Sequence, residues 1–284
     1  MAEPFDSAWI KWGWAVRHAQ QLQREIVAFM EQLDPDALGI SYEYDAKRHG
    51  FPVVITEIPQ LPVTCSALLG DAVHNFRSAL DHIAWAMVDR GRTPLHTLSE
   101  GAKRGIVFPL CDHKVARNSK DTSGWVKSHK RNLPGVCRAD LALVRAFQPY
   151  VHGRRRDMHG LAVLSALDNL DKHRTIQPVL TWPMSGRIEI SDISDCEPRN
   201  QTGLVGFGGP LNVGAELFCV RARKTGPNPK LDMHPHVTVE IAVYERILWR
   251  KWVNGVREDI AALLGRLGEP PEQINLLGVG DLEI

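Results

Sequence analysis

Residues 70–82 read GDAVHNFRSALDH and lie in the middle of a stretch with helical periodicity. Side chains three or four residues apart share one face of a helix. On such a wheel the apolar side chains of this stretch fall on one side, at Val73, Phe76, Leu80, Ile83, Ala84 and Met87. The stretch therefore predicts an amphipathic helix, which follows the turn at Pro59–Pro62 and runs to about Asp89.

Helical periodicity recurs on both sides of this stretch. It covers about 7–33 before it, and about 138–148 and 157–173 after it. A closing helix is expected over about 245–267, where it ends ahead of a glycine and a Pro-Pro pair. The pattern predicts that helices dominate the first part of the chain.

Runs rich in β-branched residues predict strands in two places. The runs at 40–44 and 53–58 are separated by a turn and favour a hairpin. Four later runs alternate between apolar and polar residues, at 176–182, 187–191, 215–223 and 236–244. Because such alternation is typical of a sheet with one buried face, we expect a small antiparallel sheet there.

This order of elements favours the α+β class, as a helical bundle with a small antiparallel β-sheet packed against it. A chain of 284 residues with 44% hydrophobic residues can bury a sizeable core. No internal repeat or low-complexity linker interrupts it. We therefore expect a single domain over 1–284, with a helical part at about 1–175, a strand-rich part at about 176–245 and the closing helix at about 245–267.

The sequence also predicts a cellular compartment. It has no basic and apolar leader of the secretory type, and no apolar run of the length that a membrane span needs. Its five cysteines lie far apart without a C-x-x-C pair, which favours a reducing compartment. We expect a cytoplasmic protein that does not enter a membrane.

Charge is unevenly distributed along the chain. Residues 101–156 contain 13 Lys or Arg and 3 Asp or Glu, a net charge of +10, whereas the rest contains 21 basic and 30 acidic residues, a net charge of −9. A polyanion such as RNA would be attracted to the basic segment. We expect nucleic-acid contacts from its basic side chains, in particular Arg154, Arg155, Arg156, Lys127, Lys130 and Arg131.

The polar side of the helix around 70–82 carries candidate functional residues. They are His74, Arg77, Ser78 and Asp81, flanked by Asn75 and His82. Taken alone, this pattern is that of an ordinary amphipathic helix with a solvated face.

A second helix, expected at 157–173, carries two carboxylates that are candidate partners for this polar side. Asp168 and Asp171 fall on the same stripe as its leucines, so two carboxylates face the core. A buried carboxylate without a partner costs several kcal/mol. We therefore expect Arg77, His74 or His82 to lie beside them, in one polar cluster that also includes His173.

Three interpretations of this polar cluster remain open. In the first, Arg77 is a structural bridge that pairs with Asp168 or Asp171. Alternatively, Arg77 stabilises charge on a phosphate while His82 transfers protons, without a metal. In the third, a divalent metal is held by ligands from both helices, chosen from His74, Asp81, His82, Asp168, Asp171 and His173. No H-x-x-x-H, E-x-x-H or H-E-x-x-H pair supports this metal site.

The spacing of Arg77 and His82, R-x4-H on a helix, resembles the R-x4-6-H motif of HEPN-domain proteins. Many of those are metal-independent endoribonucleases, in which two motifs meet across a dimer interface. The resemblance implies that Arg77 binds the phosphate, that His82 is the general acid and base, and that the protein forms a homodimer. Ser78 stands where that family usually has Asn, Asp or His, and the family is all-helical.

Several further phrases resemble those of a widespread group of bacterial proteins, a likeness that brings no activity with it. The phrases are GDAVHNFRSALDH, FPL at 108–110, QPY at 148–150 and LDNLDKHR at 167–174.

The sequence thus leads to one functional hypothesis and two alternatives. The first is a HEPN-like, nucleic-acid-directed protein, an endoribonuclease of the toxin or defence type that needs no cofactor. The second is a non-enzymatic binding or scaffold protein with a structural polar cluster. The third is a metal-dependent hydrolase that uses the His/Asp cluster.

Overall fold

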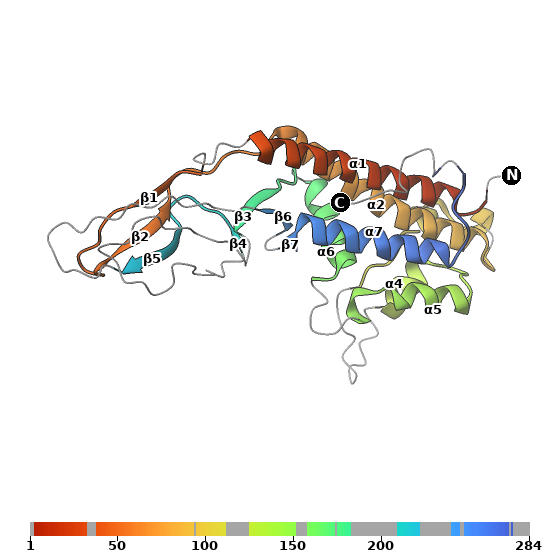
Figure 1. The fold of residues 1–284 in the computed structure, drawn as a ribbon. Coiled ribbons are helices and arrows are strands. Elements are labelled where there is room, and N and C mark those ends of the chain that lie inside the picture. Colours follow the sequence, from red (N-terminus) through yellow and green to blue (C-terminus); the bar gives the residue numbers. More distant parts are fainter. Residues whose placement is uncertain are drawn as a thin grey trace. The chain divides into compact units, whose positions relative to one another are not determined.

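The fold is that of a computed structural model. It describes residues 3–32, 38–93, 95–111, 125–151, 158–173, 175–182, 209–221, 240–244, 247–272 and 274. The described residues form helices together with two small sheets of antiparallel strands, so the α+β class is confirmed (Figure 1).

The chain forms two compact units. The first consists of Met1–Glu25, Thr64–Ile176 and Arg250–Ile284, and the second of Ile26–Val63 and Gln177–Trp249. This division does not decide whether the units fold together, so the single domain over 1–284 stays a prediction.

The five predicted helices are present in the predicted order, and two short helices, at 100–104 and 125–132, are additional to the prediction. Their bounds are α1 Asp6–Gln32, α2 Val63–Asp89, α3 Glu100–Arg104, α4 Trp125–Asn132, α5 Arg138–Ala146, α6 Gly160–Asp171 and α7 Trp249–Gly265 (Figure 1). Helix α6 begins at Gly160, later than expected, and His159 caps it by accepting a hydrogen bond from the Leu161 amide at 3.3 Å. No helix in the described part of the chain has both the length and the apolar character to cross a membrane.

Helix α2 is the central helix of the first unit. All six apolar residues of its predicted buried side are 0% exposed. Burial extends further around the helix than the wheel predicts, because Ala72, Ala79 and Val88 are also 0% exposed. Helix α2 is therefore covered on more than one side, while Asp71, His74 and Asp89 stay exposed.

Helix α7 packs against α6 and α1 through two tryptophan hydrogen bonds. The indole nitrogen of Trp252 donates to the Gly160 carbonyl at 3.1 Å, and that of Trp12 donates to the Arg257 carbonyl at 3.1 Å. A Cβ on Gly160 would lie 3.0 Å from Val256 Cγ2, so α6 begins where α7 comes closest. These contacts complete the core around α2 and α6.

The second unit contains two antiparallel sheets. The first has the order β1-β2-β5, from β1 Ile40–Tyr42, β2 Gly50–Ile55 and β5 Glu216–Arg221. The second has the order β4-β3-β6-β7, from β4 Gly209–Pro210, β3 Val179–Trp182, β6 Glu240–Tyr244 and β7 Ile247–Leu248. The predicted hairpin is confirmed by the pairing of β1 with β2, with Ile40 opposite Ile55.

One part of the strand prediction is wrong. The expected sheet of late strands would contain the run 215–223, but β5 pairs with β2 of the hairpin instead. Arg48, before β2, donates from Nη2 to Glu216 Oε1 of β5 at 2.7 Å, in an exposed ion pair. The predicted strand at 187–191 lies outside the described residues.

Candidate functional site

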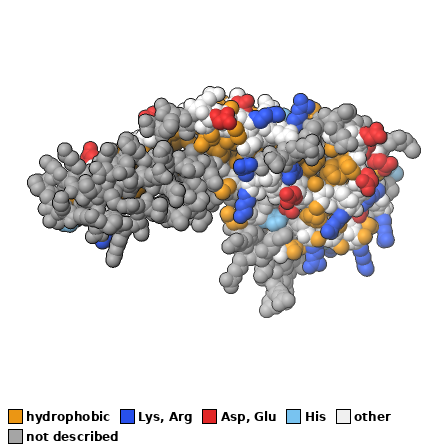
Figure 2. All heavy atoms as spheres, viewed as in Figure 1, with side chains coloured by type: hydrophobic (Ala, Val, Ile, Leu, Met, Phe, Trp, Pro, Cys, Tyr) orange, Lys and Arg blue, Asp and Glu red, His pale blue; other side chains and the backbone are white. Residues whose placement is uncertain are grey.

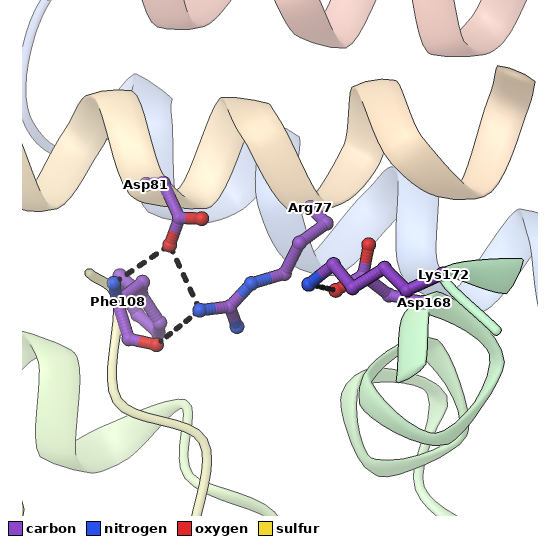
Figure 3. Close-up of polar contacts among 5 residues, drawn as sticks. All are labelled: Arg77, Asp81, Phe108, Asp168 and Lys172. Atoms are coloured by element: carbon purple, nitrogen blue, oxygen red, sulfur yellow. Dashed lines mark hydrogen bonds and ion pairs between the residues drawn. The ribbon is translucent and has the colours of Figure 1, made fainter. Parts of the chain in front are cut away.

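Arg77 and Asp81 lie one turn apart on α2 and form an ion pair. Arg77 Nη2 donates to Asp81 Oδ1 at 2.8 Å and also to the Phe108 carbonyl at 2.9 Å. The Phe108 amide donates to the same Asp81 Oδ1 at 2.8 Å, which closes a ring of three hydrogen bonds (Figure 3). The side chains of Arg77 and Asp81 are only 14% and 31% exposed.

This ring holds the segment 105–111, which follows α3. Phe108 is fully buried, and its amide and carbonyl are satisfied by two side chains of α2 instead of by a strand or helix. Arg77 and Asp81 therefore supply the backbone hydrogen-bond partners that a neighbouring strand would supply in a sheet.

A buried glutamine holds the end of the same segment. Gln148 is 0% exposed; its Oε1 accepts from the Cys111 amide at 3.0 Å and its Nε2 donates to the Val144 carbonyl at 3.1 Å. The Tyr150 amide donates to the Cys111 carbonyl at 3.2 Å. Cys111, the residue after the phrase FPL, is thus joined by hydrogen bonds to the phrase QPY.

Asp168 is buried, as its position on α6 predicts, but its partner differs from the expected ones. It is 5% exposed and pairs with Lys172 Nζ at 2.6 Å, four residues further along the chain (Figure 3). The expectation that Arg77, His74 or His82 pairs with Asp168 or Asp171 is wrong. A lysine one turn away satisfies the buried carboxylate, while its own side chain stays 58% exposed.

Asp171 brings α6 into close contact with α2. Its Oδ1 lies 3.0 Å from the position that a Cβ on Gly70 would take. The two helices with candidate functional residues are therefore neighbours, and a glycine allows their approach.

The two ion pairs influence each other through space. Burial raises the pKa of Asp81, Arg77 and the Phe108 amide oppose this rise, and the nearby Asp168 carboxylate adds to it. In Figure 3 the Arg77 side chain lies between Asp81 and Asp168. The structure thus brings Arg77, Asp81, Asp168 and Lys172 into one polar cluster, although Arg77 makes its hydrogen bonds to Asp81 and Phe108 only.

His82 lies apart from this cluster, at an open cavity of about 440 Å³. The cavity is lined by residues of the chain's start, of α2 and of the segment 105–111, namely Pro4, Ser7, Asp81, His82, Trp85, Ala86, Asp89 and Ile106. Arg77 is not among these lining residues. Asp81 therefore belongs to both places, since it pairs with Arg77 and lines the cavity beside His82.

The electrostatic surroundings of His82 favour its neutral form. Burial lowers the pKa of His82 below 6.5, the positive charge of Lys11 lowers it further, and Asp81 partly opposes both. An imidazole of this kind is unprotonated at neutral pH and can accept a proton.

The other predicted residues of the cluster lie at its edge. His74 and His173 are exposed and form no ion pair with the carboxylates in the described part of the chain, and Ser78 is half-buried. Asn75 donates to the Asp71 carbonyl at 2.9 Å and accepts from Lys11 Nζ at 3.5 Å. These residues surround the cluster without completing it.

The six residues nominated as metal ligands are all described, and they do not gather. Among the described residues no three His, Cys, Asp or Glu side chains are placed to hold a metal ion together. The geometry of these side chains thus gives the metal-dependent interpretation no support.

The predicted nucleic-acid contacts divide into two groups. Arg154, Arg155 and Arg156 lie outside the described residues. Lys127, Lys130 and Arg131 are exposed on α4.

Sequence reasoning missed the partners that complete the polar cluster. Lys172 could have been found, because a lysine four residues after a buried aspartate is a standard helical pair. The role of Phe108 had no such signal, since its backbone and not its side chain makes the contacts. Comparison of the chain with family models, with curated proteins and with solved structures found no match.

Proposed function

We propose that this chain is a HEPN-like, nucleic-acid-directed protein that cleaves RNA without a metal ion at the cavity of His82. The observation that carries the proposal is the placement of His82, a histidine with a lowered pKa in an open cavity of about 440 Å³. Cavities of roughly 300–1,000 Å³ are typical of small-ligand sites, so one nucleotide is a fitting occupant.

In this proposal, neutral His82 accepts the proton of a ribose 2′-hydroxyl. The 2′-oxygen attacks the adjacent phosphorus, the bond from phosphorus to the 5′-oxygen breaks, and the leaving 5′-oxygen takes up a proton from water. The products are a 2′,3′-cyclic phosphate and a 5′-hydroxyl end. Trp85, which lines the cavity and is 42% exposed, offers a face on which a base can stack.

Arg77 takes a different part from the one that the family resemblance implies. Its Nη2 is engaged by Asp81 and Phe108, so we assign it the role of a positioning residue. It holds Asp81 beside His82 and fixes the segment 105–111, whose Ile106 lines the cavity. The phosphate contact of Arg77 and the homodimer stay predictions. So do a bacterial origin, a cytoplasmic location and a toxin or defence role.

The experiment is to incubate purified protein with RNA in the presence of EDTA. Wild type is expected to cleave, and His82→Ala to cleave at least about 100-fold more slowly. His74→Ala, an exposed histidine of the same helix, is the matched control and should cleave like wild type. The proposal is wrong if wild type leaves RNA intact, or if the His82 variant retains the wild-type rate.

A second candidate function is a non-enzymatic binding or scaffold protein. The observation in its favour is the ring of Arg77, Asp81 and Phe108, which is complete without a ligand and ties α2 to a buried segment. This candidate predicts that Arg77 matters for stability and that His82→Ala changes no catalytic property.

A further inference from the structure

Helices α4 and α5 both turn basic side chains outward. Lys127, Lys130 and Arg131 are exposed and share one face of α4, because they are spaced by three and four residues. Arg138 and Arg145 are exposed and lie two turns apart on one face of α5. We name these five side chains the α4–α5 basic face.

The two helices themselves offer this face little negative charge. Helix α4 contains no acidic residue. The acidic residue of α5, Asp140, is engaged by Arg90, which donates to it from Nη2 at 2.7 Å and from Nε at 3.2 Å. Within the described part of the chain, Lys130, Arg131, Arg138 and Arg145 form no ion pair, and Figure 2 shows Lys and Arg side chains where Figure 1 places α4 and α5.

The link between the two helices is held in place. Residues 133–137 join α4 to α5, and within them Gly135 has a φ of 75°, which favours glycine. The Arg92 amide, just after α2, donates to the Gly135 carbonyl at 2.9 Å. The cations are thus displayed on a fixed part of the first unit.

The chemistry of the face fits phosphates better than bases or lipids. On α4 the rings of Trp125 and His129 pack together at 5.1 Å, and their positions lie on the side of the helix away from the three cations. Among the described residues, none of the exposed large apolar side chains lies on α4 or α5. A helix that inserts into a lipid interface needs such side chains, so a membrane is a poor match.

We propose that the α4–α5 basic face docks the phosphodiester backbone of single-stranded RNA. Its residues line no part of the His82 cavity, so the face is a second contact area on the same unit. The choice of RNA rests on the proposed function, whereas the docking surface rests on the charges of the two helices. Binding through phosphates alone is insensitive to base sequence and falls with rising salt.

The test measures binding of a fluorescent 2′-O-methyl RNA of about 16 nucleotides, which lacks the nucleophilic hydroxyl. The variants are Lys130→Ala/Arg131→Ala and Arg138→Ala/Arg145→Ala, and Lys251→Ala, an exposed lysine of α7, is the control. Each double variant should bind about tenfold more weakly. The slope of log affinity against log salt should become shallower by roughly 1.4, about 0.7 for each lost phosphate contact. Lys251→Ala should match wild type.

The docking surface is overturned if both double variants keep the affinity and salt slope of wild type, or if Lys251→Ala loses as much as they do. It is also overturned if the face binds vesicles of phosphatidylserine and phosphatidylcholine but not RNA. A wild type that binds through this face yet cleaves no unmodified RNA supports the docking surface and removes the proposed cleavage. If both double variants cleave RNA with an unchanged KM, the proposed cleavage is supported and the docking surface is removed.

Discussion

Asp171 of α6 lies against Gly70 of α2, with its Oδ1 3.0 Å from the place of a Cβ on that glycine. The contact joins the helix that carries His82 to the helix that carries Asp168. Glycine costs a helix interior up to about 1 kcal/mol relative to alanine, so its presence here is explained by the space that the carboxylate needs.

This contact predicts a coupling between the two positions. Gly70→Ala should gain helix propensity but press its methyl group on Asp171, whereas in an Asp171→Ala background only the gain remains. We expect Gly70→Ala to be more favourable in that background by about 1 kcal/mol. A double-mutant cycle of urea unfolding measures this difference, and strictly additive effects would show that the two residues do not interact.

Arg77→Ala should lower the free energy of unfolding by roughly 2 kcal/mol. The change removes the cation beside Asp81 and the donor to the Phe108 carbonyl, and the partial exposure of Asp81 keeps the loss below that of a fully buried pair. Arg24→Ala, an exposed arginine of α1, should change it by less than about 0.5 kcal/mol. If the Arg77 variant melts like wild type, the ring has no structural role.

The raised pKa of Asp81 predicts a pH dependence of stability. A carboxyl that holds its proton more tightly in the folded chain makes folding less favourable as it ionises. The free energy of unfolding should therefore carry a component that falls as the pH rises from 3.8 through the raised pKa. Asp81→Asn keeps the acceptor oxygen and lacks this component. Unfolding of both proteins over a pH series tests it, and a constant difference between them would contradict it.

Local periodicity predicted much of the fold. The apolar stripe of 70–82 located α2 and its buried side, because spacing on a helix depends only on nearby residues. The partner of β5 could not be predicted in this way. Strand pairing depends on which edges meet in space, and alternation in 215–223 is equally compatible with either sheet.

The sequence predicted which residues belong to the site better than it predicted which of them bond to each other. The residues Arg77, Asp81 and Asp168 were nominated from their positions on two helices, and they lie in one cluster. Their partners were missed because Arg77 and Asp81 bond to the backbone of Phe108, whose amide and carbonyl are the same in every sequence. The His82 cavity needs the segment 105–111 and the start of α1, and neither is visible from the wheel of α2.

The most direct test of the central claim is the pH dependence of kcat/KM for RNA cleavage in EDTA. If His82 accepts the proton, kcat/KM rises with pH and the midpoint of this rise lies below pH 6.5, because the pKa of His82 is lowered from that value. The His82→Ala variant should lack this titration. A wild-type profile whose midpoint lies above pH 6.5, or the same profile in the His82 variant, would contradict the account.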